Sequence, residues 1–399
     1  MPSNPSAESS LLTWRNGVFL AYLAVVMLAV AQYSLLGEEF GLWAFTKPLR
    51  LLFDQKDIEV YFRSSDWVAG GGTLYREVFS EYPVAANLVF GAVRGLSLLL
   101  PLTGHALTDF TVFWVAAGLA AVAAGALLAR RHGAAGAGWA WVLPAVVYFA
   151  AYRFDVYPAL AAALSFALLK KERLGPAAWL LGVCIALKGY ALLSLPAVLF
   201  YVHSRAGTAA ALRFLLWSLT PQVATTLLAI PFSGVEGVLS AYVFHAQRGL
   251  SGQSAWDALG LGRLVQWEPR LPALVAVLSS VAGALMRPRT LGRLVDACLV
   301  AVVGFTVSLV FYSPQFCLWF LALGSFSERR VVLALTSVLC LANYLYFPVA
   351  YDYDRLVPGV LAPAVLGVTL LRLALIVVCA VGGRASGESR PAPNAAAST

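Results

Sequence analysis

The chain has 399 residues, of which 60% are hydrophobic and only 12% are charged. Soluble domains carry about 25% charged residues, so this composition excludes an ordinary soluble globular protein. A formal net charge of +8 would suggest a nucleic-acid partner in a soluble chain, but the basic residues here lie in short loops between apolar runs. We therefore predict membrane lipids as the surroundings of the chain and no nucleic-acid partner.

The N-terminal part combines a polar tail with a first apolar run. Residues 1–14 are polar, and we predict a cytoplasmic tail. Residues 17–36 are long and apolar enough to form the first membrane-spanning helix. The triplet Ala29-Val30-Ala31 near the end of this run leaves a cleavable signal peptide as the alternative.

The polar segment at residues 37–83 is predicted to be the first outer loop. Its aromatic and basic residues at 42–53 suit a short helix in the membrane interface. The stretch Asp57–Asn87 is rich in carboxylates, and Gly70-Gly71-Gly72 must end any helix that begins near Asp57. Such a segment is more often a binding or catalytic loop than a connector. The alternative is a solvent-exposed loop whose acidic residues only keep it hydrated.

Twelve further apolar runs predict an all-α polytopic membrane protein with about 12 transmembrane helices, because lipid forces the backbone into helices. Some of the runs are too short to cross a membrane alone. A second outer loop is predicted at residues 232–270, and residues 383–399 have the composition of a disordered cytoplasmic tail. The runs lie at residues 84–102, 110–129, 137–151, 156–170, 174–187, 190–203, 211–231, 271–286, 292–311, 315–326, 331–348 and 359–382.

Basic clusters between the runs predict the orientation, because cytoplasmic loops carry an excess of Lys and Arg. If the clusters face the cytoplasm, both long polar segments face the opposite side. The two runs between residues 84 and 129 break this alternation: either one is re-entrant, with Arg94 pointing to the first, or Arg130 and Arg131 violate the rule. The clusters are Arg130-Arg131-His132, Lys170-Lys171-Glu172-Arg173, residues 203–213, residues 287–293 and Glu328-Arg329-Arg330.

No pattern in the sequence indicates a metal ion or another cofactor. The five cysteines lie singly in apolar runs, and the four histidines are scattered. There is no Walker A loop, which disfavours ATP-driven transport by this chain. No internal repeat with matching broken helices is visible, which disfavours a secondary transporter.

Several polar side chains interrupt apolar runs on the predicted outer side. Arg153 and Asp155 lie in the sequence AAYRFDVYP, Lys188 lies in CIALKGYALLSLP, and Gln315 lies in VFYSPQFCLWF. A charged side chain near the bilayer centre costs at least ~2.5–3.5 kcal/mol, so such residues usually face a cavity and have a function. The alternatives are a purely structural ion pair between Arg153 and Asp155 and, for Lys188, extension of its ammonium to the interface.

The second polar segment adds a cluster of hydrogen-bonding side chains. Residues 241–257 place His245, Arg248, Gln253 and Ser254 close together, which suits a phosphate or a sugar, although His245 alone would be an ordinary interfacial histidine. Together with the acids of the first loop, these residues predict a cavity open to the outer face. An acid that accepts a proton from a hydroxyl, beside cations that neutralise a phosphate leaving group, is what transfer from a lipid phosphate needs.

The order and spacing of several short motifs over residues 15–350 resemble the GT-C glycosyltransferases. More narrowly, they resemble family 87 (DUF2029), the polyprenyl-phosphate-mannose-dependent mannosyltransferases. The chain departs from the family pattern at Val84 and Ala191, where the family has proline, and at Gln253, where an acidic residue is expected. The motifs that match are Asp57, Tyr61, Gly72, Leu74-Tyr75, Tyr82-Pro83, the GxxxALKxY context of Lys188, Arg248 with Ser254, Ser313-Pro314-Gln315 and Trp319.

The resemblance implies a GT-C-type helix bundle over residues 15–382 and a membrane hexosyltransferase. It would transfer a hexose, in the first place mannose, from a polyprenyl-phosphate donor to an extracytoplasmic glycolipid or glycan acceptor, with inversion and without a nucleotide sugar or an obligatory metal. Asp57 matches the general base, with Asp54 and Glu59 as alternatives; Lys188 and Arg248, assisted by His245, match the groups that bind the donor phosphate. The expected substrate-binding residues are Tyr61, Glu81, Tyr82, Arg153, Asp155, Gln253, Ser254 and Gln315.

Two other functions remain as alternatives. One is a transporter or flippase for a lipid-linked sugar or polysaccharide, which has no chemistry of its own and would not need the acid at Asp57. The other is an enzyme like the O-antigen ligases, which uses a lipid diphosphate donor. For the chain itself, the resemblance implies a multi-pass protein of a bacterial inner (plasma) membrane, where the family is concentrated, with the site facing the extracytoplasmic side.

Overall fold

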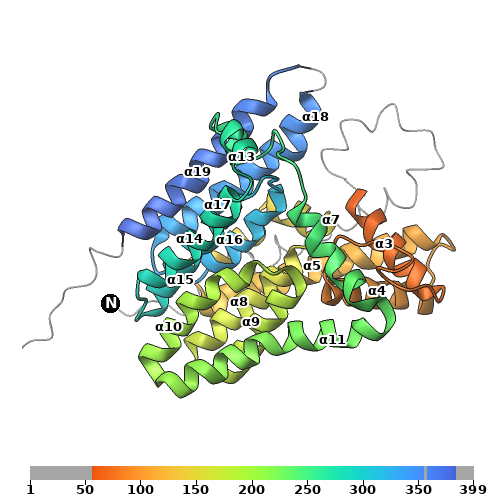
Figure 1. Cartoon of the computed structure of the whole chain (residues 1–399), viewed down its shortest axis with the longest axis horizontal. Coiled ribbons are helices and arrows are strands. Elements are labelled where there is room, and N and C mark those ends of the chain that lie inside the picture. The colour runs from red at the N-terminus through yellow and green to blue at the C-terminus, as the bar shows by residue number, and fades with distance from the viewer. Residues whose placement is uncertain (1–55, 355–356, 383–399) are drawn as a thin grey trace, which may run out of the picture.

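The computed structural model describes residues 56–354 and 357–382, and these residues form a helical bundle (Figure 1). They contain no β-strand, and the single β-type pairing among them is an isolated bridge between Leu74 and Val78. The predicted all-α fold is therefore confirmed for this part of the chain. Outside the described residues lie the predicted tails at 1–14 and 383–399, the first spanning helix at 17–36, the interfacial helix at 42–53 and Asp54.

The described helices are numbered from α3. In chain order they are α3 (Lys56–Ala69), α4 (Val84–Leu99), α5 (Ala106–His132), α6 (Ala137–Ala140), α7 (Pro144–Tyr152), α8 (Val156–Lys170), α9 (Leu174–Lys188), η2 (Tyr190–Ser194), α10 (Leu195–Ala206), α11 (Thr208–Ala246), α12 (Ala255–Ala258), α13 (Gly262–Trp267), α14 (Leu271–Leu285), α15 (Leu291–Ser308), η3 (Pro314–Phe316), α16 (Cys317–Gly324), α17 (Arg330–Tyr344), η4 (Leu345–Ala350), α18 (Tyr351–Tyr353) and α19 (Leu361–Val381).

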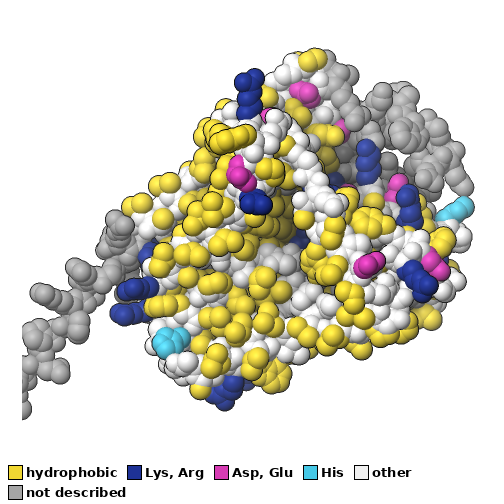
Figure 2. Space-filling view, viewed as in Figure 1, with side chains coloured by type: hydrophobic (Ala, Val, Ile, Leu, Met, Phe, Trp, Pro, Cys, Tyr) yellow, Lys and Arg dark blue, Asp and Glu magenta, His cyan; other side chains and the backbone are white. Residues whose placement is uncertain are grey.

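Five helical stretches in the described part are long and apolar enough to cross a membrane: α5, α11, α15, the stretch Arg330–Tyr353 and α19. Other apolar helices, such as α8 and α9, have 10–17 residues. One face of the bundle is covered mainly by hydrophobic side chains (Figure 2). Exposed leucines on the described helices include Leu228 on α11 and Leu285 on α14. These features indicate a membrane-embedded protein, while the number of twelve crossings stays a prediction.

The basic clusters predicted to share one side lie at one end of the bundle, here called the basic end. Lys170 Nζ donates to the carbonyl oxygen of His132 at 2.8 Å, which joins the loops after α8 and α5. Arg205, at the end of α10, pairs with Glu172 in the loop before α9. On the C-terminal side, Arg329 pairs with Asp296 of α15 at 3.3 Å.

The position of helix α4 bears on the question of whether both runs between residues 84 and 129 cross the membrane. Helix α5 ends at the basic end, and its 27 residues span about 40 Å. It therefore starts at the opposite end, where Trp114 packs against Tyr61 of α3. Helix α4 also starts at that end, and Arg94 in its second half pairs with Asp66 of α3 at 2.7 Å. The geometry favours the first alternative, in which α4 does not cross the bundle.

Two long helices are interrupted. Helix α11 continues past the predicted run 211–231 to Ala246, but Gly234 inside it has φ 70° and ψ 165°, a backbone conformation that glycine adopts easily and that a regular helix does not contain. The first part of the predicted outer loop 232–270 is thus helical. The second break is at Phe347 (φ −135°, ψ 124°), followed by Pro348. The absence of visible matching broken helices in the sequence disfavours a transporter. Two broken helices lie in the described part of the chain, which weakens that argument.

Gly118→Ala is expected to lower the stability of the bundle, because α5 and α7 approach each other closely at this glycine. A Cβ there would lie 2.1 Å from the backbone oxygen of Ala150, which cannot turn away. Overpacking costs about 1–3 kcal/mol, and a lower thermal unfolding midpoint in detergent would report it. Gly95→Ala on α4 is the control, since nothing lies within 4 Å of the position that its Cβ would take. Equal midpoints for the two variants would contradict the close approach.

Candidate functional site

A cavity of about 570 Å³ opens at the end of the bundle opposite the basic end. Its size suits a small ligand or the head group of a larger one. The lining comes from the start of α3, the loop before α4, the ends of α9 and α11, the loop after α15, and the residues after the break at Phe347. Nine predicted site residues lie on this lining: Asp57, Glu81, Tyr82, Arg153, Lys188, His245, Arg248, Gln253 and Gln315.

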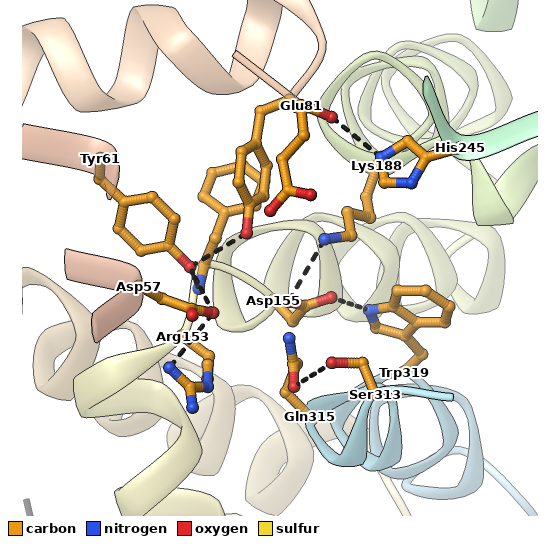
Figure 3. A network of polar contacts seen from close by, with 12 residues as sticks. Asp57, Tyr61, Glu81, Arg153, Asp155, Lys188, His245, Ser313, Gln315 and Trp319 are labelled. Atoms are coloured by element: carbon orange, nitrogen blue, oxygen red, sulfur yellow. Dashed lines mark hydrogen bonds and ion pairs between the residues drawn. The ribbon is translucent and has the colours of Figure 1, made fainter. Parts of the chain in front are cut away.

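Asp57 lies in the first turn of α3 and is held by two contacts (Figure 3). Arg153 Nη1 is 3.2 Å from Asp57 Oδ2, and the Tyr61 hydroxyl donates to the same oxygen at 3.5 Å. Tyr61 is one turn after Asp57, is fully buried, and accepts a hydrogen bond from the backbone N–H of Phe154 at 3.2 Å. Its hydroxyl is 3.3 Å from that of Tyr82, which lines the cavity. The carboxylate of Asp57 is therefore fixed in orientation.

Lys188 ends α9 because Gly189 takes the left-handed conformation (φ 64°) that commonly ends helices. Its ammonium lies 3.6 Å from Asp155 Oδ2 and 4.8 Å from the centre of the Tyr82 ring. Asp155 is 0% exposed and also accepts a hydrogen bond from Trp319 Nε1 at 3.0 Å. The buried carboxylate thus holds the cation at the cavity wall, as Figure 3 shows.

Arg248 approaches the cavity from the segment after α11. Its guanidinium lies between the rings of Phe244 and Phe311, at 4.9 and 4.6 Å from their centres, and pairs with Glu81 at 2.6 Å. The side chain of His245 contacts the same loop, with Nε2 2.9 Å from the backbone oxygen of Glu81. These contacts connect the loop before α4 to the segment at and after the end of α11.

Burial shifts the ionisation of three groups around the cavity. It raises the pKa of the Tyr61 and Tyr82 phenols well above their ordinary value, so both remain neutral hydroxyl groups. Burial also raises the pKa of the Asp155 carboxyl, while the Lys188 ammonium and the indole N–H of Trp319 act in the opposite direction. The two tyrosines are therefore hydrogen-bonding groups and not proton acceptors at neutral pH.

The alternative in which Arg153 and Asp155 form an ion pair with each other is wrong. Arg153 pairs with Asp57, and Asp155 pairs with Lys188. The Lys188 side chain is 18% exposed and its ammonium is held by the buried Asp155. Both cations are directed to the cavity by acids that lie far from them in the sequence.

Three predicted substrate-binding residues lie behind the cavity wall. Tyr61 and Asp155 are buried and act through their neighbours, Asp57 and Lys188. Ser254 is also buried, and its hydroxyl accepts the backbone N–H of Asp257 at 3.1 Å, so it caps the short helix α12. Gln315 does reach the lining, where the Ser313 hydroxyl donates to its Oε1 at 2.6 Å.

Sequence reasoning missed a group of cavity residues near the second helix break. Phe347, Tyr351 and Asp352 line the cavity, as does Lys56 at the start of α3. The sequence YLYFPVAYDYD contained a signal, because a proline with aromatic and acidic residues interrupts an apolar run. The run 331–348 predicts a spanning helix that includes Phe347 and ends at Pro348, and that prediction leaves the cavity-lining residues at and after its end out of the site.

The described residues contain no group of three or more His, Cys, Asp or Glu side chains that could hold a metal ion. Comparisons with protein-family models, curated proteins and solved structures find no match to this chain. Support for a function therefore comes from the cavity itself.

Proposed function

We propose that this protein is a membrane glycosyltransferase that moves a hexose, in the first place mannose, from a polyprenyl phosphate to a hydroxyl of a glycolipid or glycan. The observation that carries the proposal is the meeting of an oriented carboxylate with two separately anchored cations in one cavity. Asp57 supplies the carboxylate, and Lys188 and Arg248 supply the cations. The face of the bundle that is covered mainly by hydrophobic side chains supports a lipid-linked substrate (Figure 2).

Lys188 and Arg248 have the properties that a phosphate site requires. Both line the cavity, and both are held by a carboxylate, Asp155 in one case and Glu81 in the other. Charge-assisted hydrogen bonds to phosphate are stronger than neutral ones, and a partly desolvated site strengthens them further. A donor phosphate at Arg248 would take the place of the Glu81 carboxylate, which is only partly buried.

The reaction follows from this arrangement. Asp57 accepts the proton of the acceptor hydroxyl as its oxygen attacks the anomeric carbon. The bond from that carbon to the phosphate oxygen breaks, and the polyprenyl phosphate leaves with the electron pair and with its charge neutralised by Lys188 and Arg248. Attack from the face opposite the phosphate inverts the anomeric centre. In the membrane, the basic end would face the cytoplasm and the cavity the extracytoplasmic side.

The direct test is transfer of radiolabelled mannose from purified polyprenyl-phosphate-mannose to a lipid and glycan extract of the host, with the protein in proteoliposomes. Incorporation of label that depends on the protein is the expected result, and the labelled product identifies the acceptor. The same donor with a diphosphate linkage is the comparison that separates this reaction from the ligase-like alternative. Bound donor without any incorporation would contradict the proposal.

The second candidate is a flippase for a lipid-linked sugar, and the two interrupted helices favour it. Non-helical backbone at membrane depth is tolerated where it lines a cavity, and in transporters such breaks lie at the substrate site. Both α11 and the helix broken at Phe347 give residues to the cavity beyond their breaks. Movement of a fluorescent donor between leaflets without transfer, unaffected by Asp57→Asn, would support this candidate.

A further inference from the structure

The cavity has a second half that the donor site does not use. It is formed by Phe347, Tyr351 and Asp352, here called the aromatic patch, and all three line the cavity. The two rings are 5.4 Å apart between centres and are tilted by 55°. Two aromatic faces with a carboxylate beside them form a surface suited to a ring that carries both C–H groups and hydroxyl groups.

The helix break builds this patch. Phe347 has extended backbone angles between helical neighbours, and Pro348 has no N–H to continue the hydrogen-bond ladder. Asp354 stabilises the chain after α18, because its Oδ1 accepts hydrogen bonds from the backbone N–H groups of Gly359 and Leu361 at 2.9 and 3.0 Å. Asp354 therefore has a structural function, whereas Asp352, two residues earlier, lies on the cavity wall.

A continuous path of contacts connects the patch to the proposed base. The Phe347 ring lies 5.2 Å from the Arg153 guanidinium, which pairs with Asp57 at 3.2 Å. On its other side, Asp57 is linked through Tyr61 and Tyr82 to the Lys188 ammonium, at 3.5, 3.3 and 4.8 Å in turn. Asp57 thus stands between the cationic half of the cavity and the aromatic patch.

We propose that the aromatic patch is a subsite for an uncharged sugar ring of the acceptor; this inference rests on the proposed function. Phe347 and Tyr351 would pack against the C–H face of the ring, and Asp352 would accept its hydroxyl protons. The acceptor hydroxyl then meets Asp57 from the patch while the donor phosphate binds at the cationic half.

Binding of two soluble probes to the full-length protein in nanodiscs tests the subsite without any transfer. The probes are methyl α-D-mannopyranoside and octyl α-D-mannopyranoside, measured by saturation-transfer NMR. Asp352→Asn and Tyr351→Ala are each expected to weaken binding by about tenfold or more, the usual effect of losing a charge-assisted contact or an aromatic face. Tyr353→Ala is the matched control, since this side chain is in the same helical turn, is 49% exposed and does not line the cavity.

Binding of labelled polyprenyl-phosphate-mannose is measured in the same variants and is expected to stay within about twofold of wild type. Tighter binding of the octyl probe would identify a glycolipid acceptor, and equal binding a free glycan; both support the subsite. If neither probe binds wild type, or if Tyr353→Ala weakens binding as much as Tyr351→Ala, the subsite is overturned even where transfer occurs. Conversely, probe binding that is weakened by the substitutions in the aromatic patch would support the subsite even if no mannose is transferred from the donor.

Discussion

Asp57→Asn is expected to reduce sugar transfer by about 10²- to 10⁴-fold, the usual contribution of a general base, while the protein remains folded and binds its donor. An amide of the same shape still accepts the hydrogen bond from the Tyr61 hydroxyl and fits beside the Arg153 guanidinium, so we expect the local geometry to survive. It cannot, however, take the proton of the acceptor hydroxyl. Single-turnover transfer of labelled mannose at saturating donor measures the chemical step directly.

Glu59→Gln is the matched control for this experiment. Glu59 is on the same helix, two residues further on, but it is exposed and lies outside the cavity lining. We expect transfer close to that of wild type. A large loss in Glu59→Gln together with a normal rate in Asp57→Asn would move the base to the alternative residue, although the reaction would stand.

Lys188→Met is expected to have two separate effects, on stability and on donor binding. Removing one partner of a buried ion pair costs about 3–5 kcal/mol, and the smaller part of that range applies because the Lys188 side chain is 18% exposed. The loss arises because the fully buried Asp155 is left without its cation. A lower thermal midpoint and weaker binding of polyprenyl-phosphate-mannose are the expected measurements.

The double variant Lys188→Met/Asp155→Asn separates the two effects. It removes both charges, and the asparagine oxygen still accepts the indole N–H of Trp319. Stability should therefore return toward that of wild type while donor binding remains weak. Recovery of donor binding together with stability would show that Lys188 has only a structural function.

The helices were largely predictable because apolar composition determines them. The predicted run 156–170 has the bounds of α8, and the run 174–187 ends one residue before α9 does. The end of α11 was missed, since polar residues after 231 resemble a loop even though the backbone continues as a helix beyond Gly234. Ser233, Gly234 and Glu236 have the composition of a loop although they lie within α11, so composition alone did not separate the two.

The sequence predicted which residues line the site, but it did not predict which of them form ion pairs with each other. Nine expected side chains reach the cavity: six come from the two predicted polar segments, and Arg153, Lys188 and Gln315 come from places where polar groups interrupt apolar sequence and usually face a cavity. Neighbours in sequence were nevertheless a poor guide to partners: Arg153 and Asp155 are separated by one residue but contact Asp57 and Lys188. Such pairings depend on how helices far apart in the sequence pack together, which spacing within a single segment does not contain.

The cavity is electrically neutral when its described charged side chains are counted together. The described cations and anions are equal in number, and three of each form the pairs Arg153–Asp57, Lys188–Asp155 and Arg248–Glu81. A ligand therefore enters a site whose described charges balance. A phosphodiester brings a single negative charge, whereas a diphosphate brings a second one that no unmatched cation among the described residues can compensate in a poorly solvated cavity. Under the proposed function, this balance of charge favours a lipid carrier with one phosphate over a carrier with two. The four cations and four anions are Lys56, Arg153, Lys188 and Arg248, and Asp57, Glu81, Asp352 and the underlying Asp155.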